Sequence, residues 1–113
     1  MVSAAIKFLM SEIDNLLSLL DRGQDNALLR FSLGNAYLKN GNYELASENF
    51  SKAVTFDPDY SAAWKLYARS LDKNGKTEKA IKTYQQGIKV AENKGDIQAA
   101  KEMKVFLKRL KKS

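Results

Sequence analysis

The chain has 113 residues, of which 44% are hydrophobic and 28% are charged, and its formal net charge is +6. These values indicate a single globular domain and argue against disorder. Because cysteine and histidine are absent, the sequence excludes a disulfide framework, a thiol nucleophile and the commonest metal ligand. The first residues also lack a membrane span of roughly 20 apolar residues and the unbroken apolar core of a signal peptide. We therefore expect a cytoplasmic protein without a cofactor or a bound metal.

The N-terminal residues predict an amphipathic helix that begins after the N-cap Ser3 and ends near Asp21. At helical spacing, one apolar stripe contains Leu9, Met10, Ile13, Leu16, Leu17 and Leu20. Phe8 and Leu19 lie off this stripe, on one flank of the helix. They are therefore predicted to form a small apolar pair on the surface.

Turn residues then divide the chain into five further helical segments. The separators are Gly23, Asn40-Gly41, Asp57-Pro58, Asn74-Gly75 and Gly95. The predicted helices cover residues 27–39, 43–56, 60–73, 77–93 and 97–111, and either Asp25 or Asn26 caps the first of these. Since no stretch alternates between apolar and polar residues, the sequence predicts an all-α protein with antiparallel neighbouring helices.

The two central helix pairs share a pattern with a period of 34 residues. The matching pairs are Gly34 and Ala68, Gly41 and Gly75, Ala46 and Ala80, Phe50 and Tyr84, and Ala53 and Gly87. A fixed period of this length indicates stacked structural repeats. Glycine inside a helix costs about 1 kcal/mol relative to alanine. We therefore expect Gly34 and Gly87 to lie where a side chain would collide with a neighbour.

The spacing of Leu33-Gly34 and Tyr37, followed by Ala46, Phe50, Ala53 and Pro58, resembles the tetratricopeptide repeat. The resemblance implies an all-α fold, an α-α superhelix that forms a short solenoid of about six antiparallel helices. It also implies a non-enzymatic module that binds a protein or peptide partner. The chain departs from the family pattern at Arg30, where a large apolar residue is usual, and at Glu92, where the closing proline is usual.

The resemblance divides the single domain, residues 1–113, into four parts. These are an N-terminal packing helix in residues 1–24, repeats at residues 27–60 and 61–94, and a C-terminal capping helix in residues 95–113. The last helix has a lysine-rich face, as expected of a polar-backed cap.

In this family the first helix of each repeat lines a concave groove that commonly holds a peptide. The resemblance places in this groove Phe31, Asn35 and Leu38, then Lys65, Arg69 and Asp72, and from the last helix Lys101 and Lys104, with Leu28 and Ile97 at the helix starts. Such a groove is apolar at one end and basic at the other, which favours an acidic, partly apolar segment. Asn35 matches one residue of the carboxylate clamp of some family members, but Phe31 and Leu66 replace two others.

The charge distribution leaves two other functions open. Residues 1–72 have a net charge of −2 and residues 73–113 a net charge of +8, so the C-terminal part is a candidate for binding nucleic acid or another anionic surface. Its single arginine, Arg109, and the lack of aromatic residues between the lysines argue against nucleic acid. Self-association through Phe8 and Leu19, or through the open face of the first helix, is the third possibility, and we expect a monomer or a weak homodimer. No acid–base pair, metal cluster or phosphate-binding loop predicts an enzyme.

Overall fold

Six α-helices and no strand make up the part of the chain that the structure describes. The computed structural model describes residues 4–112, apart from the side chains of residues 5–10. The helices are α1 (Ala4–Asp21), α2 (Ala27–Lys39), α3 (Tyr43–Phe56), α4 (Ser61–Lys73), α5 (Thr77–Lys94) and α6 (Ile97–Lys112). The predicted helices are thus confirmed, with end points that differ by one residue in α4, α5 and α6. The predicted cap Ser3 and the side chain of Phe8 lie outside the described residues.

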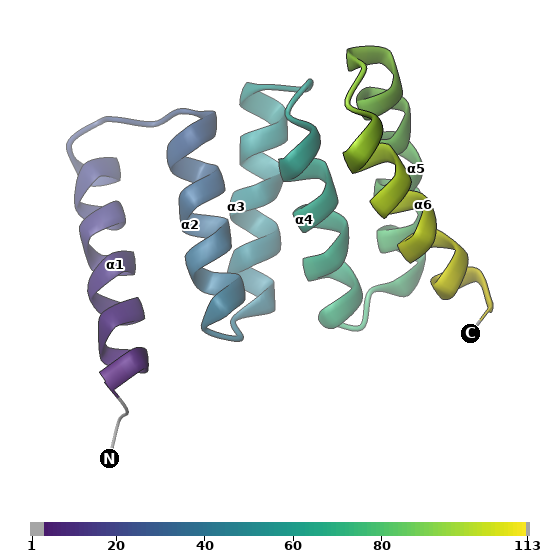
Figure 1. Cartoon of the computed structure of the whole chain (residues 1–113). Helices are drawn as coiled ribbons and strands as arrows, with labels where there is room; N and C mark the ends of the chain where they lie inside the picture. Colours follow the sequence, from purple (N-terminus) through teal and green to yellow (C-terminus); the bar gives the residue numbers. More distant parts are fainter. Residues whose placement is uncertain (1–3, 113) are drawn as a thin grey trace.

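The helices pack as an antiparallel row, with consecutive helices in contact. Figure 1 shows α2, α4 and α6 in a near layer and α3 and α5 behind them, with α1 at one end of the row. Residues of α4 also contact both α2 and α6. This arrangement is the all-α superhelix that the sequence predicts. The division into two whole repeats and two flanking half-repeats stays our prediction.

Caps explain where the helices begin and end. Asn26, and not Asp25, caps α2, because its side chain accepts a hydrogen bond of 2.8 Å from the backbone N–H of Leu29. Asn42 caps α3 in the same way. Gly95 ends α5 with a φ of 82°, a left-handed conformation that favours glycine.

Two glycines allow the helices to approach closely. A Cβ atom added to Gly34 would lie 2.7 Å from the ring of Phe50, which is fully buried. A Cβ atom added to Gly87 would lie 2.7 Å from the sulfur of Met103 and 2.9 Å from Cβ of Trp64. The prediction that side chains at these positions would collide is therefore confirmed. Gly34 thus lies where α2 packs closely on α3, and Gly87 lies where α5 packs closely on both α4 and α6.

Arg30 departs from the family pattern, and its polar partners explain how. Its guanidinium donates two hydrogen bonds to the carboxylate of Asp25, at 2.8 and 2.9 Å, and a third to Oδ1 of Asn49 at 3.1 Å. The side chain is only 11% exposed. A charged residue is therefore tolerated at an apolar position because its donors are satisfied.

Candidate functional site

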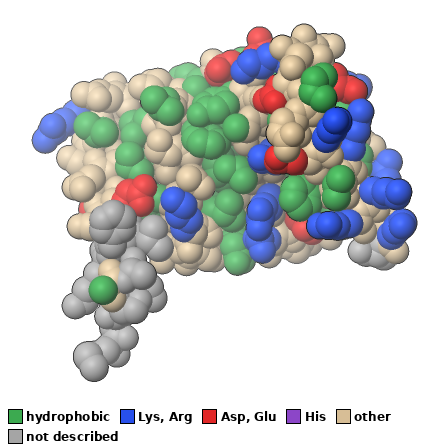
Figure 2. Space-filling model, viewed as in Figure 1, with side chains coloured by type: hydrophobic (Ala, Val, Ile, Leu, Met, Phe, Trp, Pro, Cys, Tyr) green, Lys and Arg blue, Asp and Glu red, His purple; other side chains and the backbone are tan. Residues whose placement is uncertain are grey.

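The candidate site is the surface formed by α2, α4 and α6, which we call the front face. Figure 2 shows this surface in the view of Figure 1, with a band of hydrophobic side chains over α2 and α4 and many lysine and arginine side chains over α6. The front face is therefore apolar near α2 and basic near α6, as the sequence predicts for the groove.

Aromatic rings form the apolar part of the front face. The ring of Phe31 stacks on that of Tyr60 with centroids 4.8 Å apart, and meets the ring of Phe50 edge-on at 5.7 Å. Phe31 and Tyr60 are half-buried, and burial raises the pKa of Tyr60, with a smaller contribution from the charge of Asp57. The two rings hold each other in place while part of their surface remains open. They form a rigid apolar platform.

The other predicted residues of α2 extend this platform. Asn35 and Leu38 are half-buried, and the side chain of Leu28 is 66% exposed. At about 100° per residue, Phe31 and Leu38 lie about 20° apart on the helix, and Asn35 lies within about 60° of both. The structure therefore brings these predicted residues together on one side of α2.

An ion pair occupies the corresponding place between α4 and α6. Nζ of Lys65 lies 2.6 Å from the carboxylate of Glu102, which also accepts a hydrogen bond of 2.9 Å from Gln98. The hydrogen bond from Lys65 holds the pKa of Glu102 below its ordinary value, and the bond from Gln98 adds to this effect. Lys65 thus already has a carboxylate partner within the chain.

Arg69 and Asp72 lie one and two turns further along α4. They line a hollow of about 240 Å³ together with Lys73, Tyr84, Phe106, Arg109 and Leu110. The pKa of Tyr84 is raised to about 12, mainly by burial, with a smaller contribution from the charge of Asp72 and an opposing one from Arg69. Arg69 is exposed, and within the described residues it forms no ion pair. It is therefore a cation that an incoming carboxylate can reach.

The two predicted residues of α6 lie apart from this cation. Lys101 is exposed, and Nζ of Lys104 lies 3.0 Å from the carboxylate of Glu92 on α5. Tyr60 is the cap of α4, and α6 begins after Asp96, so the starts of these two helices are 36 residues apart. The repeat period is 34 residues, so residues of α6 are displaced by two positions from those that the period predicts. The structure thus brings Lys65 and Arg69 together on α4 but directs Lys104 towards α5.

Two contributors to the front face were not found from the sequence. The sequence predicts Tyr60 only as the start of a helix and gives no role to Glu102, whereas the structure places Tyr60 against Phe31 and Glu102 against Lys65. The helix starts give a signal for Glu102. Leu66 is six residues after Tyr60, and Glu102 is six residues after Asp96, so the two residues hold equivalent positions in α4 and α6. This position is apolar in α4, and in α6 it is a carboxylate that pairs with Lys65.

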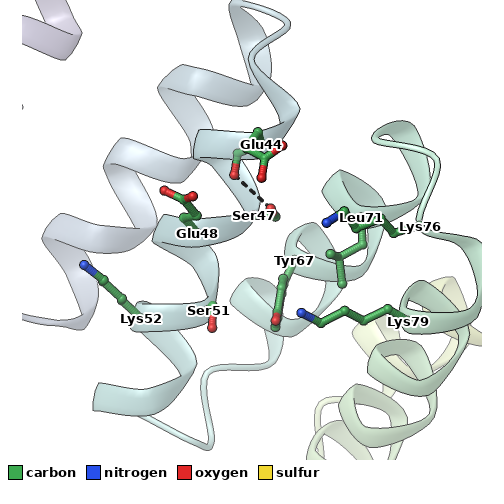
Figure 3. Close-up of a pocket in the computed structure, with 9 residues that line it drawn as sticks. All are labelled: Glu44, Ser47, Glu48, Ser51, Lys52, Tyr67, Leu71, Lys76 and Lys79. Atoms are coloured by element: carbon green, nitrogen blue, oxygen red, sulfur yellow. Dashed lines mark hydrogen bonds between the residues drawn. The ribbon is translucent and has the colours of Figure 1, made fainter.

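A second hollow, of about 430 Å³, lies away from the front face, between α3 and α5. Figure 3 shows Tyr67 and Leu71 of α4 at its floor, with Glu44 on the α3 side and Lys79 on the α5 side. No ion pair joins the acidic residues of α3 to these lysines in the described part of the chain. The hollow therefore has acidic side chains on its α3 side and lysines on its α5 side.

Metal chemistry and membrane insertion find no candidates among the described residues. Within residues 4–112, no group of three or more acidic side chains could hold a metal ion. Among the helices described, none has both the length and the apolar character needed to cross a bilayer.

Known proteins resemble the chain over most of its length. A family model described as tetratricopeptide repeat (TPR) matches residues 37–103. A TPR repeat-containing protein of Pseudomonas aeruginosa is 45% identical over 98 residues, which cover 87% of this chain and 93% of that protein. The solution structure of a Bordetella parapertussis protein matches with a TM-score of 0.78 and 37% identity, over 88% of this chain and 87% of that one.

The fold also matches the crystal structure of the Sgt2 TPR domain from Aspergillus fumigatus, with a TM-score of 0.73 and 22% identity over 96% of this chain and 74% of that one. TPR domains generally mediate contacts between proteins, and they are typically not enzymes. The repeated helix pairs, the glycines at their crossing points and these matches agree with one another. The chain belongs to the tetratricopeptide repeat family.

Proposed function

We propose that the front face binds a segment of a partner protein that has apolar side chains and at least one carboxylate. One observation carries the proposal: α2 and α4 are in contact, and they supply the stacked rings of Phe31 and of Tyr60, the residue just before α4, together with the exposed cation Arg69. An apolar side chain that covers the platform gains roughly 25 cal/mol for each Å² removed from water. A carboxylate beside a guanidinium gains charge-assisted hydrogen bonds.

The roles of the cations within this face differ. Lys65 is occupied by Glu102 at 2.6 Å, so a ligand that takes Lys65 has to displace this carboxylate. Arg69 has no such competitor among the residues described. We therefore assign the main carboxylate contact to Arg69, with Lys65, Asp72 and Lys101 at the edges of the site.

A peptide selection tests the proposal. Random 12-residue peptides displayed on phage are selected on the protein, with removal of those that also bind the Leu28→Asp/Arg69→Glu variant. Leu28 and Arg69 are both exposed, so the variant keeps its core. The selected peptides should be rich in apolar and acidic residues, and each single substitution should weaken their binding about tenfold.

The matched control is Lys79→Glu, which reverses an exposed charge in the hollow between α3 and α5. Its affinity for the selected peptides should equal that of the unmodified protein. If peptides bind equally well to the Arg69→Glu variant, or if the selection yields no acidic preference, the assignment of the front face is wrong.

A further inference from the structure

One side of α6 forms a second charged surface, distinct from the front-face platform. Residues at positions 97, 101, 104, 105, 108 and 112 fall within about 100° of the helix circumference. All six are exposed, including the apolar side chains of Ile97, at 58%, and Val105, at 49%. We call these six residues, Ile97, Lys101, Lys104, Val105, Lys108 and Lys112, the open face of α6.

The place of α6 in the row explains why this surface is uncovered. In the earlier part of the row, each front helix is packed against the helix that follows it in the chain: α2 against α3, and α4 against α5. Figure 1 shows α6 at the end of the row, and no helix among the described residues follows it. The surface where a further helix would lie in a longer solenoid is therefore open to solvent.

The charge on this surface has one sign. Its four lysines lie about 4.5 to 6 Å apart along the helix axis, at about 1.5 Å per residue. No acidic residue belongs to the open face. Lys104 is paired with Glu92, but both side chains are at least 50% exposed, so the pair opposes a competing carboxylate only weakly. Beside the lysines, Leu107 lines a hollow of about 310 Å³ together with Lys104, Lys108, Lys111 and Lys112.

This pattern fits another helix better than it fits a phosphate backbone. Glutamates three or four residues apart on a helix have the same axial spacing as these lysines. The exposed side chains of Ile97 and Val105 require an apolar surface, which phosphates do not offer, and half-buried Leu107 lies beside the lysines in the hollow. The open face has no aromatic side chain to stack on bases, and Arg109 lies over the ring of Phe106 at 5.8 Å.

We propose that the open face of α6 docks an acidic amphipathic helix of a partner protein. The apolar stripe of that helix covers Ile97 and Val105, and its carboxylates lie along the lysines. The helix occupies the position that the next helix of a longer solenoid would take. This surface shares Lys101 with the edge of the peptide site but does not include the platform of Phe31 and Tyr60.

A synthetic helix tests the proposal directly. The probe is a fluorescent 21-residue peptide with leucine at the first and fourth positions of each heptad, glutamate beside them and alanine elsewhere. A second peptide has glutamine in place of each glutamate. The acidic peptide should bind, its affinity should fall as salt rises, and the glutamine peptide should bind about tenfold more weakly. Amide chemical shifts should change around Ile97 and Leu107 and not around Phe31.

Two variants separate the charged and apolar parts of the contact. Lys101→Glu/Lys104→Glu/Lys108→Glu should weaken binding by at least about tenfold, and Ile97→Ser/Val105→Ser by several-fold. The matched control is Lys79→Glu/Lys82→Glu/Lys89→Glu, which reverses three exposed charges of α5 and should leave the affinity within about twofold. Circular dichroism of each variant confirms that the helices remain folded.

Other occupants are direct competitors in the same assay. A 20-base-pair DNA duplex and vesicles that contain phosphatidylglycerol are titrated against the same variants, and sedimentation velocity at two concentrations detects self-association. The proposal is wrong if DNA or vesicles bind the open face more tightly than the acidic peptide. It is also wrong if the three lysine substitutions abolish a dimer of the protein itself, or if the acidic peptide does not bind.

Discussion

Arg30 is a charged side chain held between two helices, and Asp25 and Asn49 satisfy it. The hydrogen bonds from Arg30 hold the pKa of Asp25 below its ordinary value of 3.8, although desolvation acts in the opposite direction. A carboxyl group whose pKa is lowered on folding stabilises the protein above the unfolded pKa, and this contribution is lost as the pH falls through the folded pKa. The pair therefore adds stability above about pH 4 and little at pH 2.

Replacement of Arg30 tests this contribution. Arg30→Met keeps the length of the side chain but leaves the carboxylate of Asp25 without its partner and buried Asn49 with one donor fewer. We expect the free energy of unfolding at pH 7 to fall by about 1–3 kcal/mol. Most of this follows from Asn49, because Asp25 is 37% exposed and its ion pair is screened by solvent.

Urea denaturation at pH 7 and at pH 2.5 measures both parts. The difference between the two proteins should be smaller at pH 2.5 than at pH 7, because the contribution of Asp25 is lost as the pH falls through its lowered pKa. Lys39→Met, an exposed change on the same helix, should alter the free energy of unfolding by less than about 0.5 kcal/mol at either pH. An equal deficit of Arg30→Met at both pH values would contradict the role given to Asp25.

Residue spacing predicted the packing of this protein better than its polar contacts. A side chain at position 34 would collide with Phe50. This was predictable because the repeat period places Gly34 where two helices cross. The partner of Lys65 does not follow from the period, because Glu102 lies in a helix whose register is shifted by two residues. The side chain of a lysine is long and flexible, so a shift of two residues in the facing helix changes the partner that it reaches. The close approach at Gly34 is fixed by the position of the backbone and does not depend on such a side chain.

At the scale of the helices, Asp96 links the N-terminal ends of α4 and α6. Its carboxylate accepts a hydrogen bond of 2.5 Å from the hydroxyl of Ser61 at the start of α4, and one of 3.2 Å from the backbone N–H of Ala99 in α6. These bonds, the one from Ser61 first, lower the pKa of Asp96. One side chain thus caps α6 and fixes its start beside that of α4.

Removal of the cap should loosen α6. Asp96→Ala is expected to lower the free energy of unfolding by about 1 kcal/mol, the usual cost of losing an N-cap. A double-mutant cycle with Ser61→Ala should show a coupling of at least about 0.5 kcal/mol between the two residues.

Thermal and urea unfolding measure these values, and Asp59→Ala, an exposed aspartate just before α4, is the control. If the effects of Asp96→Ala and Ser61→Ala add without coupling, the side chains do not act together. The helix ends were predictable from the sequence because caps and glycines act locally. The contact of Asp96 with Ser61 was not, because it joins residues 35 positions apart.

The whole molecule is a row in which each helix is stabilised mainly by its neighbours. The central helices have a neighbour on each side, whereas the described residues of α1 pack against α2 alone. Of the α1 side chains that the structure describes, only Ile13 is buried. The central helices each bury several side chains, including Phe50 in α3 and Tyr84 in α5. Stability should therefore decrease towards the N-terminal end.

Amide hydrogen exchange followed by NMR tests this gradient. Amides of α1 should exchange through local opening with a low free energy, and amides of α3, α4 and α5 should approach the free energy of global unfolding. The exposed C-terminal turn of α6 serves as an internal reference for fraying. Protection of the α1 amides equal to that of α4 would show that the row unfolds as a single cooperative unit.

The shifted pKa values of the acidic and tyrosine side chains have a common feature. The pKa values of Asp25, Asp96 and Glu102 are lowered, and those of Tyr60 and Tyr84 are raised, so every shift moves away from neutrality. The chain also has no histidine, the side chain that ordinarily changes charge near pH 7. Association with anionic partners should therefore respond to the ionic strength of the surroundings and remain insensitive to mild acidification.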